Sequence, residues 1–119
     1  QKKYLFPLEQ RMDWIRRVFK KEPKVSVETY TGLTINYCKQ RGIKYIIRGI
    51  RSSADFEYEK TIADANRSLD RTIETIFLTG EPQYTSVAST IVRDILRNGG
   101  DASSFLPPEV NATLLKMQA

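Results

Sequence analysis

Two arginines and a glycine stand together directly after an apolar run, in the segment KYIIRGIR. Arg48 and Arg51 carry planar, permanently charged groups whose forked N–H donors fit a phosphate, and Gly49 lets a ligand approach the backbone. The pattern therefore indicates a phosphate-binding site. The alternative is that both arginines lie on the surface and pair with nearby acidic residues, which are Asp55, Glu57 and Glu59.

Four hydroxyl side chains gather at the expected start of a helix, in the segment TSVAST. They are Thr85, Ser86, Ser89 and Thr90. Free backbone N–H groups and the positive end of the helix dipole favour an anion there, and hydroxyls add further donors. For any one of them the alternative is ordinary N-capping, by Thr85 or Ser86. Capping alone explains the whole group less well than an anion site does.

The composition excludes several kinds of active site. The sequence contains no histidine and a single cysteine, Cys38, which rules out a zinc site built on Cys and His and the Ser/His and Cys/His nucleophile pairs. Cys38 lies in an apolar pattern and is expected to be a buried, inert thiol. No GxGxxG or P-loop lysine motif is present. Chemistry by this chain must rely on positioning and charge, and no metal ligand is assigned.

Length and charge are typical of one globular domain. The chain has 119 residues, 40% hydrophobic and 28% charged, and a single domain over residues 1–119 is expected. No apolar stretch approaches the roughly 20 residues that span a bilayer, and no signal peptide is evident, so a cytoplasmic location is expected. The net charge of +5 favours an anionic partner. The basic residues are dispersed, however, whereas nucleic-acid-binding modules usually show a contiguous stripe.

Apolar periodicity predicts an alternation of helices and strands. The expected helices cover residues 8–21, 33–40, 54–69, 88–96 and 108–117, and the expected strands cover 25–30, 43–47 and 74–78. The nearly continuous apolar run at 43–47 is typical of a parallel strand covered on both faces. The alternation implies an α/β fold with a doubly wound parallel sheet, in which ligands bind beyond the carboxyl ends of the strands.

Several longer segments resemble those of one family. They are KKYLFPLEQR, YTGLT, IIRGIRSSADFEYE, IADANRSL, IETIFL, YTSVASTIVR and GDASSFLPPEV. In combination they make the chain similar to the bacterial phosphopantetheine adenylyltransferases over nearly its whole length. The resemblance implies a Rossmann-like nucleotidyltransferase that joins ATP and 4'-phosphopantetheine to give dephospho-coenzyme A and pyrophosphate. It also implies magnesium, a hexamer, and direct attack of the acceptor phosphate on the α-phosphate of ATP.

The resemblance also assigns roles to individual residues. Those that match the acceptor site are Lys2 at the reacting phosphates, Arg48 at the phosphopantetheine phosphate, and Leu33, Thr34, Asn66 and Asp94 along the pantetheine arm. Those that match the nucleotide site are Gly49, Ile50, Arg51 and Glu59, followed by Tyr84, Thr85, Ser86, Val87, Ala88, Ser89 and Thr90 around the triphosphate. No catalytic residue is assigned within this sequence.

Two departures from the family pattern matter. Ala88 stands where the family commonly has serine, so one hydroxyl contact is expected to be absent, although the backbone donors remain. The family's opening strand and its GTFDP…GH motif, which supplies a transition-state histidine, are not found in a sequence that opens QKKYLF. We therefore expect the sequence to be the C-terminal part of an adenylyltransferase domain, with weak binding and little catalysis on its own.

Three alternative functions stay open. One is a related transferase that acts on another phosphorylated acceptor. The second, from a different class, is a nucleic-acid-binding module, for which the sequence shows neither a basic stripe nor exposed stacking aromatics clearly. The third is a noncatalytic remnant that serves in assembly. The expected partners are ATP and 4'-phosphopantetheine together with further copies of the chain, and neither nucleic acid nor a membrane.

Overall fold

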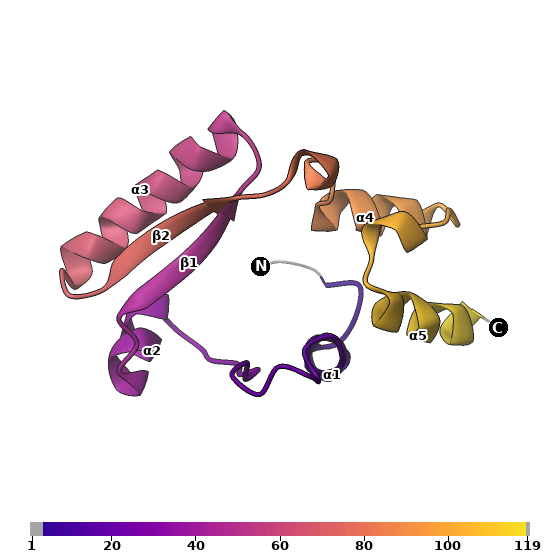
Figure 1. The fold of residues 1–119 in the computed structure, drawn as a ribbon, viewed down its shortest axis with the longest axis horizontal. Helices are drawn as coiled ribbons and strands as arrows, with labels where there is room; N and C mark the ends of the chain where they lie inside the picture. The colour runs from indigo at the N-terminus through magenta and orange to yellow at the C-terminus, as the bar shows by residue number, and fades with distance from the viewer. Residues whose placement is uncertain (1–3, 119) are drawn as a thin grey trace. The chain divides into compact units, whose positions relative to one another are not determined.

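The computed structural model describes residues 4–118, whose path is drawn in Figure 1. The described chain divides into two compact units. Tyr30–Ser86 forms one, and the segments up to Thr29 and from Val87 onward form the other. Each unit is described below by itself, and the expected single domain over residues 1–119 stays a prediction.

The unit Tyr30–Ser86 is built on two parallel strands. Its elements in chain order are α2 (Thr34–Arg41), β1 (Tyr45–Ile50), α3 (Ser53–Leu69), β2 (Glu74–Thr79) and a short 3-10 helix, η1 (Pro82–Tyr84). The parallel register sets Tyr45 beside Glu74 and Ile50 beside Thr79. Because parallel strands need a crossover connection, α3 leads from the end of β1 back to the start of β2. This arrangement confirms the predicted α/β, Rossmann-like fold class.

Helix α3 forms where the apolar spacing of residues 54–69 predicted it. Its first turn is capped by Ser52, whose side chain accepts a hydrogen bond of 3.2 Å from the backbone N–H of Asp55. α3 lies along one face of the strand pair, as Figure 1 shows. Phe56 of the helix meets Phe77 of β2 edge to face, with ring centroids 5.7 Å apart. The helix is therefore fixed over the strands by aromatic packing near its start.

The opposite face of the strand pair is exposed and apolar. Tyr45, Ile47, Ile76 and Leu78 are 63%, 62%, 41% and 56% exposed. The helices of this unit pack against the other face, α2 through Ile46 and α3 through the phenylalanine pair. The prediction that the strand at 43–47 is covered on both faces is therefore wrong for the described unit.

A small core joins α2 to the beginning of the strands. It consists of Ile35, Cys38 and Ile73, which are 1%, 3% and 3% exposed, with two partly buried isoleucines packed against them. Cys38 is a buried free thiol, as its apolar surroundings predicted. Helix α2 ends at Gly42, whose φ of 67° is left-handed and favours glycine, which confirms the predicted C-cap.

The other unit is helical. It contains α1 (Leu8–Val18), α4 (Ser89–Arg97), a 3-10 helix η2 (Ser103–Phe105) and α5 (Pro108–Gln118). α1 contacts α5, and Trp14 is buried with its ring edge to face with Phe6 at 4.8 Å. None of the helices in the described residues is long and apolar enough to cross a membrane.

Two predicted elements differ from the structure in this part of the chain. Residues 25–30 alternate in polarity but form no strand within the described residues. A strand needs a neighbour that accepts and donates its backbone hydrogen bonds, which an alternating pattern cannot supply. The first helix ends at Val18 instead of residue 21, because Phe19 already leaves helical geometry.

Candidate functional site

A pocket of about 370 Å³ lies where β1 and β2 end and α3 begins. Its lining residues are Ile50, Arg51, Ser52, Ser53, Phe56, Thr79 and Gly80. Figure 1 shows the arrowheads of both strands near the first turn of α3. Ligands in open α/β sheets bind at the carboxyl ends of the strands, and the volume is within the range of about 300–1,000 Å³ for small-molecule sites. The structure therefore forms a hollow at the edge where the sequence predicted the phosphate site.

Arg48 lies inside β1 and not after it, contrary to the sequence prediction. The ladder continues because Gly49 pairs with Leu78 and Ile50 pairs with Thr79. Side chains alternate across a strand, so Arg48 and Ile50 share one face with their Cα atoms about 7 Å apart. That face is the one that α3 covers, and it brings Arg48 close to the pocket at the end of the strand.

Arg48 is held by a two-fold hydrogen bond to Glu59 of α3. Its Nε donates to Oε2 at 2.9 Å and its Nη2 donates to Oε1 at 2.7 Å. The glutamate side chain is 12% exposed, whereas the arginine side chain is 53% exposed. These hydrogen bonds lower the pKa of Glu59 and raise the pKa of Arg48. Both groups therefore stay charged at neutral pH.

Arg51 is held at the start of α3 by Asp55. The carboxylate oxygen Oδ2 accepts from both the backbone N–H and the Nε of Arg51, each at 3.1 Å. The same aspartate donates its backbone N–H to the Ser52 cap. A carboxylate in the first turn also suits the positive end of the helix dipole. The local sequence RSSAD therefore fixes the position of Arg51 at the mouth of the pocket.

Both arginines thus pair with acidic residues, as the alternative interpretation of the sequence expected. Pairing does not remove a guanidinium from ligand binding, because each has five N–H donors. The predicted contacts of Arg48 with a phosphate, and of Gly49, Ile50, Arg51 and Glu59 with a nucleotide, stay predictions. What the structure adds is that these five residues lie in one unit: Arg48, Gly49 and Ile50 end β1, Arg51 follows it, and Glu59 of α3 contacts Arg48.

The residues predicted along the pantetheine arm lie at the start of α2 and on α3 in this unit, and on α4 in the other. Leu33 precedes α2 and is 56% exposed, and the Thr34 hydroxyl lies 2.6 Å from that of Tyr30. Asn66 is half-buried on α3. Asp94 lies on α4, in the other unit, where its Oδ1 accepts from Asn98 at 3.2 Å. Lys2 lies outside the described residues.

The hydroxyl-rich segment spans the boundary between the units. Tyr84, Thr85 and Ser86 end one unit, and Val87, Ala88, Ser89 and Thr90 begin the helical part of the other. The Thr85 hydroxyl donates to the carbonyl of Pro82 at 2.8 Å. The N-cap of α4 is Ala88, which makes no side-chain capping hydrogen bond. Capping of this helix by Thr85 or Ser86 is therefore wrong, and its anion-binding role stays a prediction.

The pocket also contains residues that the sequence analysis did not assign. Ser52, Ser53 and Phe56 come from the start of α3, and Thr79 and Gly80 from the end of β2. The serines carried a signal, because a Ser-Ser pair before a helical stripe is typical of an N-cap. The end of β2 could have been found by applying to both parallel strands the rule that ligands lie at their carboxyl ends.

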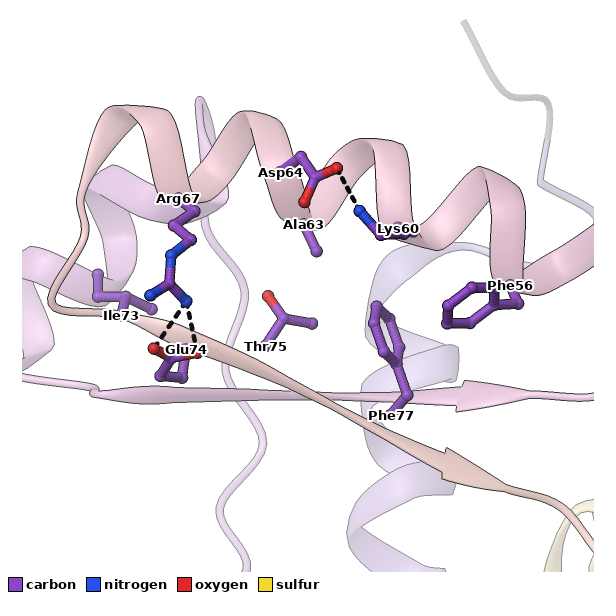
Figure 2. A pocket seen from close by; sticks show the side chains of 9 residues that line it. All are labelled: Phe56, Lys60, Ala63, Asp64, Arg67, Ile73, Glu74, Thr75 and Phe77. Atoms are coloured by element: carbon purple, nitrogen blue, oxygen red, sulfur yellow. Dashed lines mark hydrogen bonds and ion pairs between the residues drawn. The ribbon is translucent and has the colours of Figure 1, made fainter.

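A second pocket, of about 280 Å³, lies between α3 and β2. Figure 2 shows Phe56 and Phe77 at one end of it and the Arg67–Glu74 pair at the other. Arg67 Nη1 donates to both carboxylate oxygens of Glu74 at 2.8 and 2.9 Å. Lys60 Nζ pairs with Asp64 at 2.8 Å. The basic side chains drawn there are paired with carboxylates, as Arg48 and Arg51 are. This pocket lies along α3 and not beyond the carboxyl ends of the strands, where ligands bind in open α/β sheets.

Metal binding by the protein alone is not supported by the residues that the structure describes. They include no group of three or more Asp, Glu, His or Cys side chains placed to hold an ion. Mg²⁺ is often bound through substrate phosphates with few protein ligands.

Comparison with known proteins defines the class to which this fold and site belong. The sequence profile of the cytidylyltransferase-like family matches residues 1–95, and the chain belongs to that family. Phosphopantetheine adenylyltransferase of Flavobacterium psychrophilum is 52% identical over 110 residues, which cover 92% of this chain and 72% of that relative. The enzyme of the same name from Flavobacterium johnsoniae is 49% identical with the same coverage. That of Bacteroides fragilis is 51% identical over 86% of this chain and 67% of its own length.

Proposed function

We propose that the protein transfers the adenylyl group of ATP to 4'-phosphopantetheine, which gives dephospho-coenzyme A and pyrophosphate, a step in coenzyme A biosynthesis. The observation that carries this proposal is an identity of about half with relatives named phosphopantetheine adenylyltransferase, over most of the chain. Arg48 inside β1 and Arg51 directly after it, beside a pocket of small-molecule size, support it.

The proposed reaction is a direct transfer between phosphates. An oxygen of the acceptor phosphate forms a bond to the α-phosphorus of ATP, and the bond from that phosphorus to the β-phosphate oxygen breaks, which releases pyrophosphate. The protein's part in such a reaction is positioning and electrostatic stabilisation of the charge that develops. Arg48 would hold the acceptor phosphate, and the segment from Gly49 to Arg51, at the end of β1, would lie against the nucleotide.

The remaining parts of the proposal concern partners and surroundings. ATP would enter as its magnesium complex, whose ion neutralises phosphate charge. The protein would act in the cytoplasm as an oligomer, a hexamer by resemblance. We propose these points on the resemblance to the family. Binding of the anion ATP also agrees with the net charge of the chain, which is +5.

The test is isotope exchange in the protein that carries this chain. Labelled pyrophosphate should appear in ATP when dephospho-coenzyme A is present, because the reverse reaction consumes both. The label should stay in pyrophosphate when dephospho-coenzyme A is omitted. Exchange without dephospho-coenzyme A, or no exchange with it, would refute the proposal. In the forward direction, other phosphorylated acceptors in place of 4'-phosphopantetheine separate this reaction from that of a related transferase.

A further inference from the structure

The Arg48–Glu59 pair is unequally exposed. The carboxylate is 12% exposed and the guanidinium side chain is 53% exposed, so the glutamate lies beneath the arginine on the side of α3. An ordinary surface ion pair leaves both partners in water and contributes little. Here the inner partner is largely enclosed, and its pKa is lowered by the hydrogen bonds from Arg48. The glutamate is therefore in a position to hold the arginine in one orientation.

The hydrogen bonds use one particular edge of the guanidinium group. Glu59 accepts from Nε and Nη2, which form the side edge of the planar group. Of the five N–H donors of an arginine, two are used in this way, and three remain on Nη1 and Nη2. Nη1 and Nη2 together form the end edge, which can bind two oxygens of a phosphate. A phosphate at the end edge therefore need not displace the carboxylate.

We propose that Glu59 is a positioning residue that holds the side edge of Arg48, so that the end edge of the guanidinium is presented to the phosphate of the acceptor. This inference rests on the proposed function and goes beyond it. The side-edge hydrogen bonds to Glu59 persist when the phosphate is bound. Because Glu59 already restricts the orientation of Arg48 in the free protein, the arginine loses less conformational freedom when the phosphate binds.

The first experiment measures affinity for two probes that differ by one phosphate. Wild-type protein and the Glu59→Gln variant are titrated with 4'-phosphopantetheine and with pantetheine. Glutamine keeps the size of the side chain but has one oxygen and no charge, so it loses at least one of the two hydrogen bonds. We expect the dissociation constant for 4'-phosphopantetheine to rise about tenfold, and that for pantetheine to change less than about twofold.

The second experiment follows the Arg48 side chain directly. The Nε–H signal of Arg48 in a nitrogen-15 spectrum should be sharp in the free protein and absent or shifted in Glu59→Gln. On saturation with 4'-phosphopantetheine the signal should persist, because the ligand occupies the other edge. Loss of the Nε–H signal on saturation would mean that the phosphate displaces Glu59, and would overturn the inference.

The chain offers a matched control. Arg67 and Glu74 form another two-fold pair between α3 and a strand, at the second pocket. Glu74→Gln should leave both dissociation constants unchanged if the effect at Glu59 is specific. An equal rise in the dissociation constants for both probes in Glu59→Gln would show that Glu59 has a merely structural role. Wild-type protein that binds no 4'-phosphopantetheine would refute the proposed function itself, whereas wild-type binding that is unaffected by Glu59→Gln would refute the positioning role alone.

Discussion

Replacing Arg48 by lysine keeps the positive charge and removes the fork, which makes this substitution a sharp test of the site. In the structure, Glu59 uses two donors on the side edge of the guanidinium, and the end edge is available for a phosphate. An ammonium group has three donors on a single nitrogen and no second edge. In Arg48→Lys, the carboxylate and the phosphate would therefore compete for one small group.

The size of the effect follows from the number of contacts. With a carboxylate beside it that is 12% exposed, the ammonium will favour Glu59, and at least one hydrogen bond to the phosphate is lost. A hydrogen bond to a charged group contributes roughly 1.5–3 kcal/mol. The dissociation constant for 4'-phosphopantetheine should then rise by about 10- to 150-fold.

Calorimetric titration with 4'-phosphopantetheine measures this change, with Arg67→Lys, near the C-terminal end of α3, as the matched control. The control replaces an arginine of similar exposure, 57% against 53%, whose carboxylate partner lies at the second pocket. We expect it to bind the acceptor as the wild type does. Unchanged affinity in Arg48→Lys would refute the reasoning, because it would show that a point charge suffices or that the phosphate binds elsewhere.

Three further predictions concern stability. Ile35→Ala empties the centre of the small core, where the side chain is 1% exposed, and should lower the free energy of unfolding in urea by about 2–5 kcal/mol. Ala88→Ser supplies the missing N-cap of α4 and should raise the stability by about 1 kcal/mol in the same assay; no gain would mean that this helix start is already satisfied. The Arg48–Glu59 pair lowers the pKa of Glu59, so its contribution is present at neutral pH and is lost as the pH falls through that lowered value. The difference in free energy of unfolding between wild type and Glu59→Gln should therefore be present at pH 7 and become smaller at a pH well below 4.5, the usual glutamate pKa. An equal difference at these two pH values would contradict this.

Elements with strong local signals were predictable from the sequence. The apolar stripe of 54–69 gave α3, the run at 74–78 gave β2, and Gly42 marked the end of α2. The strand expected at 25–30 was wrong because its alternation says nothing about a hydrogen-bonding neighbour. Likewise, Arg48 followed by Gly49 suggested the end of a strand, whereas the pairing with β2 continues β1 to Ile50.

The candidate site was predictable in its location and less so in its contacts. The rule that ligands bind at the carboxyl ends of parallel strands located the pocket from the pattern alone. Which carboxylate would meet which arginine could not be read from spacing, because Glu59 reaches Arg48 through the crossover geometry of α3 over β1. The sequence offered Asp55, Glu57 and Glu59 equally, and packing of α3 on the sheet selects between them.

Cys38, the single cysteine of the sequence, makes the chain suited to thiol labelling. Because its side chain is 3% exposed in the core beneath α2, a maleimide or disulfide reagent can react there only when that core opens. The labelling rate therefore reports the opening equilibrium of the unit Tyr30–Ser86, without a signal from the helical unit. Slower labelling in the presence of a nucleotide or of 4'-phosphopantetheine would give their binding energy to this unit through mass action, with no engineered probe.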